Sequence, residues 1–315
     1  MNFCFLGNSH FSAIVLQNLL NNNFAPNLVI TTSPKPIGRK QILTSNEVDI
    51  LAQNNNIKII YGDHLNDNVF LDTLKQEKID LGVLASFGKI IPKTMIKLFP
   101  YGIINIHPSL LPKYRGPSPI QTALLNGDTE TGVTLFILSE GIDDGPIIGE
   151  VHQTIDPDDT FQTLSKKLAD IGATLAINIL PEYKNGKVFV RTQKDSDATF
   201  TKKFTYKDGK INWNNTSQAI YNQIRALSHE PGTYCFFDKN KKQQTLKIHQ
   251  ANLIIPDKLL IDISPSTPGT AIFHNNHFLI SSTDGLIDLL LVQPEGKNIM
   301  SGPAFWHGNK ISLLY

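Results

Sequence analysis

The chain has 315 residues, of which 41% are apolar and 18% are charged, a composition that excludes collagen-like, low-complexity and intrinsically disordered proteins. Its net charge of +1 is too small to indicate nucleic-acid binding by itself. The charge is unevenly spread, because residues 1–200 hold 17 basic and 20 acidic side chains whereas residues 201–315 hold 12 and 8. The second part is therefore mildly basic, which permits a phosphate-bearing partner without requiring one.

The sequence also bears on cellular location. No apolar run approaches the roughly 18 residues that a bilayer span needs, and the first ten residues lack the cationic start of a signal peptide. Cys4 and Cys235 are too far apart to indicate a disulfide framework or a metal motif. We therefore expect a cytoplasmic protein, bacterial rather than organellar, with no membrane segment, two reduced buried thiols and a monomeric state.

Short apolar runs alternate with helical periods over the first 180 residues. The predicted strands are 2–6, 27–32, 57–60, 80–84, 102–106 and 132–138. The predicted helices are 11–20, 47–54, 66–76, 118–125 and a long one at 160–180, which Pro181 is expected to end. This alternation predicts an α/β fold with a Rossmann-like, mostly parallel sheet, helices on both faces and ligands at the carboxyl ends of the strands.

The chain after residue 180 follows a different pattern. Residues 181–203 are polar and irregular, which is typical of a linker, and residues 217–227 have helical spacing. Five short strands are then predicted at 232–238, 245–255, 269–273, 277–281 and 286–292, with a hairpin turn at 274–277. We predict domains at 1–180 and 204–315, the second an OB-like β-barrel with a plain β-sandwich as the alternative.

Two patterns that often mark ligand sites are incomplete. "FLGNSHFS" at 5–12 has only Gly7 where a dinucleotide fingerprint needs three glycines, so Gly7 indicates a tight turn first and a phosphate contact second. His274 and His277 are spaced H-x-x-H, but they flank the predicted turn and lack a third ligand nearby in sequence. We expect neither an NAD site nor a metal site.

Asn105 and His107 form the first candidate for chemistry. Alternation along an extended strand puts both on one face, near the carboxyl end where the predicted fold binds ligands. An imidazole can transfer a proton near pH 7, and an amide can donate a hydrogen bond to a developing oxyanion. Alone, such a pair is more typical of a structural hydrogen-bond pair, and catalysis would need a third member. A loop stiffened by four prolines follows, at Pro108, Pro112, Pro117 and Pro119.

A third member for this pair is found in "SEGIDDGPII" at 139–148. Asp143 lies there between Gly141 and Gly145, which allow the backbone to approach a ligand closely. Alone, the segment indicates an ordinary turn. Next to His107, however, the carboxylate would orient the imidazole and raise its pKa.

These motifs resemble a known family. "NIHPSLLPKYRG" at 105–116 and "GIDDG" at 141–145 are similar to the signature of the folate-dependent formyltransferases, over roughly the first 180 residues. Three further stretches are similar to the branch that formylates methionyl-tRNA: "TTSPKPIGRK" at 31–40, "DGKINWNNTSQAIYNQIRAL" at 208–227 and "LVQPEGKNIMSGPAF" at 291–305. The resemblance then covers nearly the whole chain.

The resemblance implies transfer of a formyl group from 10-formyltetrahydrofolate to the α-amino group of methionyl initiator tRNA, without a metal. The catalytic triad falls on Asn105, His107 and Asp143. The folate-binding positions fall on Phe87, Gly88, Ile90, Ile91, Gly141, Ile142, Asp144 and Gly145. The substrate-binding positions fall on Ser109, Leu110, Leu111, Pro112, Arg39, Lys40 and Arg115, with residues 204–315 as a tRNA-binding domain.

The sequence departs from the family in the basic loop. Gln41 and Ile42 follow Gly38-Arg39-Lys40 where relatives carry a denser cationic cluster, so we expect a shallower salt dependence of tRNA binding. Two alternatives stay open. One is a formyltransferase for a nucleotide-linked amino sugar, and the other is an RNA-binding or folate-sensing protein with an inactive site.

Overall fold

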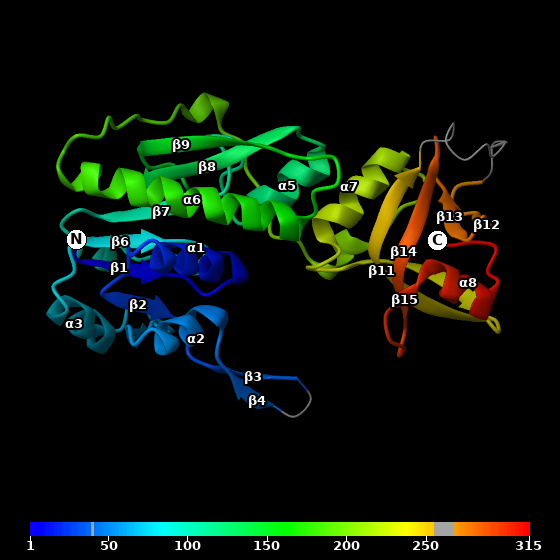
Figure 1. Cartoon of the computed structure of the whole chain (residues 1–315), viewed down its shortest axis with the longest axis horizontal. Coiled ribbons are helices and arrows are strands. Elements are labelled where there is room, and N and C mark those ends of the chain that lie inside the picture. Colours follow the sequence, from blue (N-terminus) through cyan, green and yellow to red (C-terminus); the bar gives the residue numbers. More distant parts are fainter. Residues whose placement is uncertain (39–40, 255–266) are drawn as a thin grey trace. The chain divides into compact units, whose positions relative to one another are not determined.

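Figure 1 shows the computed structural model of the chain, which describes residues 1–38, 41–254 and 267–315. The chain divides into two compact units. Unit 1 comprises Met1–Pro119, Glu130–Ile155 and Thr163–Thr201, and unit 2 comprises Ile120–Thr129, Asp156–Gln162 and Lys202–Tyr315. Each unit buries an apolar cluster of its own. The domain boundaries at 180 and 204 stay a prediction.

Unit 1 is built on a seven-stranded sheet in the order β5-β2-β1-β6-β7-β8-β9. The strands are β1 Phe3–Leu6, β2 Leu28–Thr31, β5 Lys58–Tyr61, β6 Leu81–Leu84, β7 Ile103–His107, β8 Glu130–Ile137 and β9 Ile147–Thr154. From β5 to β7 neighbouring strands are parallel, and β8 and β9 are antiparallel. The predicted mostly parallel α/β sheet is confirmed.

Helices pack on this sheet, and α6 runs along β7 to β9 (Figure 1). The helices of unit 1 are α1 His10–Asn21, α2 Glu47–Asn54, α3 Asn68–Gln76, α4 Lys93–Ile96 and most of α6 Phe161–Lys184. Helix α5 Pro119–Asn126 belongs to unit 2 from Ile120 onward. At Gly172 of α6, an added Cβ would lie 2.8 Å from Ile106 Cγ2 of β7. Because side chains alternate along a strand, Asn105 and His107 point to the opposite face of β7.

The prediction that Pro181 ends the long helix is wrong. Helix α6 continues to Lys184 with Pro181 inside its last turns. A proline removes one backbone donor and crowds the preceding turn, which is tolerated near a helix end. The chain leaves the helix at Gly186, whose φ of 69° is the left-handed conformation that commonly follows a helix.

The sequence analysis also missed several short elements. Strands β3 Lys35–Ile37 and β4 Ile42–Thr44 form a separate two-stranded ribbon, and every described residue in them is exposed. With no face to bury, the ribbon shows no apolar alternation, and Pro36 argues against a strand. Strand β3 lies in the predicted basic loop at 31–40 and β4 follows that loop. Arg39 and Lys40 of the loop fall outside the described residues.

Unit 2 is a curled antiparallel sheet with strand order β10-β11-β14-β13-β12, and β15 pairs with β14. Its elements are α7 Ser217–Leu227, β10 Thr233–Lys239, β11 Lys242–Ile254, β12 Ala271–His274, β13 His277–Ser281, β14 Leu286–Pro294, β15 Met300–Ser301 and α8 Gly302–Asn309. The two edge strands are joined by the C-terminal residues. Leu314 N–H donates to Gly269 O at 2.8 Å, and Phe236 N–H donates to Tyr315 O at 2.7 Å.

This closure confirms the barrel and overturns the sandwich alternative, because a sandwich leaves two separate sheets. The predicted hairpin is also present. Asn275 and Asn276 form its turn with φ of 46° and 63°, the signs that a type I′ turn requires. In the part of the chain that the structure describes, no helix is long and apolar enough to cross a membrane.

Candidate active site

Strand β7 carries two buried polar side chains to its carboxyl end. Asn105 is 7% exposed and His107 is 4% exposed. Both line a pocket of about 390 Å³, together with the end of β6 and the loop after it, the segment around Gly116 and the loop between β8 and β9. The pocket therefore lies at the sheet edge where a parallel α/β fold binds ligands.

The imidazole of His107 is held by one backbone group. Its Nε2 lies 3.0 Å from the carbonyl oxygen of Tyr114. A carbonyl only accepts, so Nε2 carries the proton and donates it. Tyr114 has a φ of 64°, a left-handed conformation that an aromatic residue rarely adopts and that often marks a functional site. The second ring nitrogen, Nδ1, is left to face Asp143.

Asp143 comes from the loop between β8 and β9. Its Oδ2 lies 3.6 Å from Nδ1 of His107, which is too long for a hydrogen bond. The same oxygen accepts a hydrogen bond from the N–H of Gly116 at 2.7 Å. The loop is packed tightly on β8, since a Cβ added at Gly145 would lie 1.8 Å from the carbonyl oxygen of Ile137. The structure thus brings the predicted triad together around one pocket.

Opposing effects set the pKa of His107. Burial lowers it, and this effect exceeds the opposing influence of the Asp143 carboxylate and of the Tyr114 carbonyl. The predicted effect of Asp143 on the pKa is therefore confirmed, but burial outweighs it, because the sequence does not show how completely the ring is desolvated. The imidazole is neutral at pH 7, with a lone pair on Nδ1 opposite the carboxylate.

Asn105 has a polar atom left over. Its Oδ1 is buried and has no hydrogen-bond partner among residues 1–38, 41–254 and 267–315. A buried polar atom without a partner costs free energy, so such an atom beside a pocket is a reason to expect a ligand there. Rotation of the amide by 180° would present its NH2 at the same place, and Asn105 can therefore accept from or donate to a bound substrate.

The predicted folate-binding residues are divided between the pocket and its surroundings. Phe87, Gly88, Ile90 and Ile142 line the pocket. Ile90 is 94% exposed and Ile142 is 64% exposed, so two apolar side chains face solvent at this opening. Ile91 is buried in the apolar cluster of unit 1. Of the others, Gly141 contacts Asp144 and Gly145 packs on β8, so they shape the loop.

None of the described substrate-binding residues predicted from the sequence is among the residues that line the pocket. Ser109 and Leu111 are buried, and Ser109 Oγ donates to Lys113 O at 2.6 Å. Leu110 and Pro112 are half-buried. The guanidinium of Arg115 is 4% exposed and bonded within unit 1, as described below. Their substrate-binding role stays a prediction, as it does for Arg39 and Lys40, which lie outside the described residues.

Three residues of the site were not predicted from the sequence. Lys89 lines the pocket and donates to Asp63 O at 2.5 Å, and in sequence it directly follows Gly88, a predicted folate-binding position. Tyr114 acts through its carbonyl, which has no side-chain signature. Gln193 bonds to the loop of Asp143 from a distant segment, and its position in a polar stretch gave no signal.

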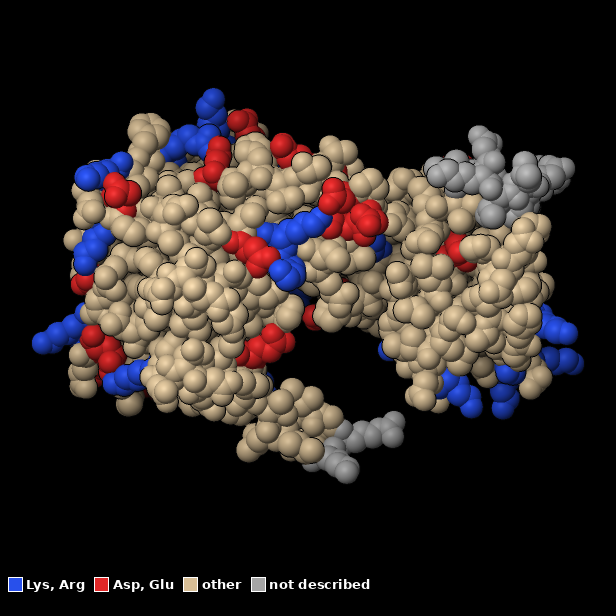
Figure 2. All heavy atoms as spheres, in the orientation of Figure 1, with Lys and Arg blue, Asp and Glu red and all other residues tan. Residues whose placement is uncertain are grey.

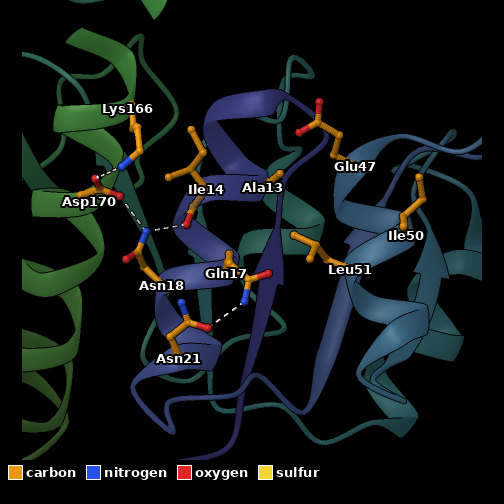
Figure 3. A pocket seen from close by; sticks show the side chains of 10 residues that line it. All are labelled: Ala13, Ile14, Gln17, Asn18, Asn21, Glu47, Ile50, Leu51, Lys166 and Asp170. Atoms are coloured by element: carbon orange, nitrogen blue, oxygen red, sulfur yellow. Dashed lines mark hydrogen bonds and ion pairs between the residues drawn. The ribbon is translucent and has the colours of Figure 1, made fainter. Parts of the chain in front are cut away.

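A second hollow, of about 550 Å³, lies between α1, α2 and α6 (Figure 3). Lys166 pairs with Asp170 at 2.7 Å, and Asn18 donates to Asp170 at 2.8 Å and to Ile14 O at 2.9 Å. These polar groups bond to one another. The pocket beside β7 has instead an amide oxygen with no hydrogen-bond partner in the described part of the chain and a histidine nitrogen that faces a carboxylate at 3.6 Å, so it is the candidate active site.

Within the described ranges, no three His, Cys, Asp or Glu side chains are placed to hold a metal ion. His277 donates from Nδ1 to Asp288 at 2.6 Å and thus belongs to a structural pair. Cys4 and Cys235 are buried free thiols whose pKa is raised by that burial.

The sequence matches known proteins over nearly its whole length. The formyl transferase family matches residues 1–180, and the formyl transferase C-terminal domain matches residues 203–310. Methionyl-tRNA formyltransferase from Thermodesulfovibrio yellowstonii is 34% identical over 98% of this chain and 96% of its own. The protein of that name from Dictyoglomus thermophilum is 36% identical over 99% of this chain and 98% of its own.

A solved structure is similar as well. WlaRD, a sugar 3N-formyl transferase determined in the presence of dTDP and 5-N-formyl-THF, is 26% identical, with a TM-score of 0.62. The similarity covers 95% of this chain and 99% of WlaRD.

Proposed function

This chain belongs to the methionyl-tRNA formyltransferase family, and on that basis we propose that it transfers the formyl group of 10-formyltetrahydrofolate to the α-amino group of methionyl initiator tRNA. The observation that carries the proposal is the meeting of Asn105, His107 and Asp143 around one pocket at the carboxyl end of β7. The reaction prepares the initiator tRNA for translation.

The pocket suits the folate co-substrate. Its volume of about 390 Å³ lies within the range of small-molecule sites. Ile90 and Ile142 offer apolar surface for a flat ring system at the opening, and the amide of Asn105, whose Oδ1 has no partner among the described residues, offers a polar group inside. Bound there, the folate supplies an activated formyl group on nitrogen. Phe87 and Gly88 complete the wall that would hold it.

His107 supplies the proton transfers. The attacking amine has a pKa near 8, so a useful fraction is neutral at pH 7 and needs little activation. As the new C–N bond forms, Nδ1 of the neutral His107 accepts the proton that the amine loses. The ring then carries a positive charge opposite Asp143, which stabilises it. The same proton passes to the folate nitrogen as the old C–N bond breaks, so the proton count balances.

Asn105 acts on the carbonyl oxygen of the formyl group. Negative charge develops on this oxygen when the amine attacks, and a preorganised amide NH2 beside it stabilises that charge. Such a donor acts strongly in a site that is shielded from water. Since Asn105 is buried on a strand, the cost of orienting it is met when the protein folds.

Unit 2 is the proposed tRNA-binding part. Residues 201–315 hold 12 Lys and Arg against 8 Asp and Glu. On the face drawn in Figure 2, basic side chains gather at one edge of unit 2, whereas both signs are interspersed over unit 1. Phosphate contacts to such basic groups supply most of the sequence-independent affinity for nucleic acid. The protein acts as a cytoplasmic monomer in this proposal.

One assay tests the substrate. The protein is incubated with formyl-folate and, separately, with methionylated initiator tRNA, methionylated elongator tRNA and a dTDP-linked amino sugar. The sugar is included because of the similarity to WlaRD. We expect rapid formylation of the initiator tRNA alone. Formylation of the sugar with no tRNA product would replace the proposed substrate, and no product in any arm would refute the proposal.

A further inference from the structure

The segment 191–201, predicted from sequence to be linker, bonds to both loops of the candidate site. Ile147 N–H donates to Arg191 O at 2.8 Å, just after the Asp143 loop. Arg115 N–H donates to Thr199 O at 2.9 Å, and Tyr114 N–H donates to Thr199 Oγ1 at 2.9 Å. All of these residues belong to unit 1. The segment is therefore part of the structure around the site.

Gln193 makes the most extensive contacts within this segment. It is 9% exposed. Its Oε1 accepts from Nε and Nη2 of Arg115 at 3.1 and 2.9 Å. Its Nε2 donates to the carbonyl oxygens of Asp143 and Gly145, both at 2.8 Å. The amide thereby fills both acceptor and both donor positions, so its orientation is fully determined.

We propose that Gln193 is a positioning residue that sets the separation between Nδ1 of His107 and the carboxylate of Asp143. One end of its amide fixes the backbone of Asp143 directly. The other end fixes Arg115, whose side chain also pairs with Asp195 at 2.8 Å. The expected effect on formyl transfer rests on the proposed function, whereas the hydrogen bonds of Gln193 do not depend on it.

The neighbours of Arg115 explain how this contact reaches the imidazole. Tyr114 holds Nε2 of His107 through its carbonyl, and Gly116 holds the carboxylate of Asp143 through its N–H. Fixing Arg115 thus fixes both anchors at once. Because a misplacement of about 1 Å can reduce a rate by about 100-fold, a residue that controls this separation controls the reaction without touching the substrate.

Two variants separate the two ends of the amide. Gln193→Met keeps the length of the side chain and removes all four hydrogen bonds. Gln193→Glu keeps an acceptor for Arg115 but replaces the NH2 that donates to the carbonyls of Asp143 and Gly145. Thr192→Ala is the matched control, since Thr192 is adjacent and exposed. The readouts are single-turnover formyl transfer, the KM for tRNA, thermal melts and an NMR titration of the His107 ring.

We expect both Gln193 variants to react about 10- to 100-fold more slowly than Thr192→Ala, with a KM for tRNA within about twofold. In Gln193→Met, the pKa of His107 should fall below the wild-type value, because a loosened Asp143 raises it less. If Gln193→Met fails to fold, Gln193→Glu decides by its rate and KM. A wild-type rate in a folded variant together with an unmoved His107 titration would overturn the inference.

The two proposals fail in different ways. A wild-type protein that formylates none of the offered acceptors would refute the proposed function. The titration of His107 in Gln193→Met would still report whether Gln193 holds Asp143 in place.

Discussion

Each unit of the molecule contains a histidine–aspartate pair, and the two pairs differ in geometry. In unit 2, Nδ1 of His277 donates to Oδ2 of Asp288 at 2.6 Å. In unit 1, Nδ1 of His107 and Oδ2 of Asp143 are 3.6 Å apart. The side chain of His277 is 42% exposed, whereas that of His107 is 5% exposed. The same two residue types thus form a closed hydrogen bond in the barrel and an open pair in the pocket.

The difference shows how one residue pair can serve stability or chemistry. Asp288 lies on β14 opposite Leu279 of β13, so its bond to His277 supports pairing of neighbouring strands. The pair in unit 1 is held apart by other partners, namely Tyr114 for the imidazole and Gly116 for the carboxylate. Because backbone groups maintain this gap, Nδ1 of His107 is not held in a hydrogen bond to Asp143 and can accept and release a proton.

Loss of the pocket side chains should have the largest effect. We expect His107→Ala and Asn105→Ala each to slow single-turnover formyl transfer by about 10² to 10³, equivalent to roughly 3 to 4 kcal/mol, because each removes a group that acts on the reacting atoms. His277→Ala should leave the rate at saturating tRNA within about twofold. Near-wild-type rates in both pocket variants would contradict the catalytic role of the pair in unit 1.

Loss of the closed pair should act on stability instead. We expect Asp288→Ala to lower the free energy of unfolding by about 1 to 2 kcal/mol, since it removes a hydrogen bond and leaves the half-exposed ring of His277 to water. Thermal and urea melts measure this change. The formylation rate at 25 °C is the second readout, and a rate loss larger than about tenfold would contradict the structural role.

The pH dependence of stability should distinguish the open pair. The pKa of His107 in the folded protein lies below its ordinary value of 6.5, so the native state stays neutral where the unfolded chain takes up a proton. Stability from this group is therefore complete above pH 6.5 and falls as the pH drops below it, by up to about 1.4 kcal/mol per pH unit. Urea melts between pH 7.5 and 5 should show a shallower decline for His107→Gln than for wild type. An identical decline would contradict this.

The fold was largely predictable because its signals are local. The apolar run that ends at Leu6 and the helix at 47–54 follow directly from periodicity, and alternation alone placed Asn105 and His107 on one face. The extent of α6 was not predictable, because tertiary packing decides whether a helix continues past a proline near its end, and local sequence does not show that packing.

The site was predictable only in its residue types. Periodicity and spacing indicated Asn105, His107 and Asp143 only as candidates, and the family resemblance implied that they form a triad. The net pKa of His107 depends on burial and on the carbonyl of Tyr114. The 3.6 Å gap depends on Gln193, which is 50 residues from Asp143 in sequence. Contacts of such separation leave no mark in a local pattern. The geometry of the site therefore depends on tertiary contacts, whereas the identity of its side chains can be predicted from local sequence.

The smallest effect should come from the larger hollow shown in Figure 3. Lys166 and Asp170 are one helical turn apart on α6, with side chains 67% and 37% exposed. Solvent screens such a pair, so we expect Lys166→Ala to lower the free energy of unfolding by no more than about 0.5 kcal/mol and to leave formyl transfer unchanged. Asn18 also bonds to Asp170, and a double-mutant cycle with Asp170→Ala isolates the ion pair from that contact. A rate loss above about tenfold in Lys166→Ala would mean that chemistry is not confined to the open pair of unit 1.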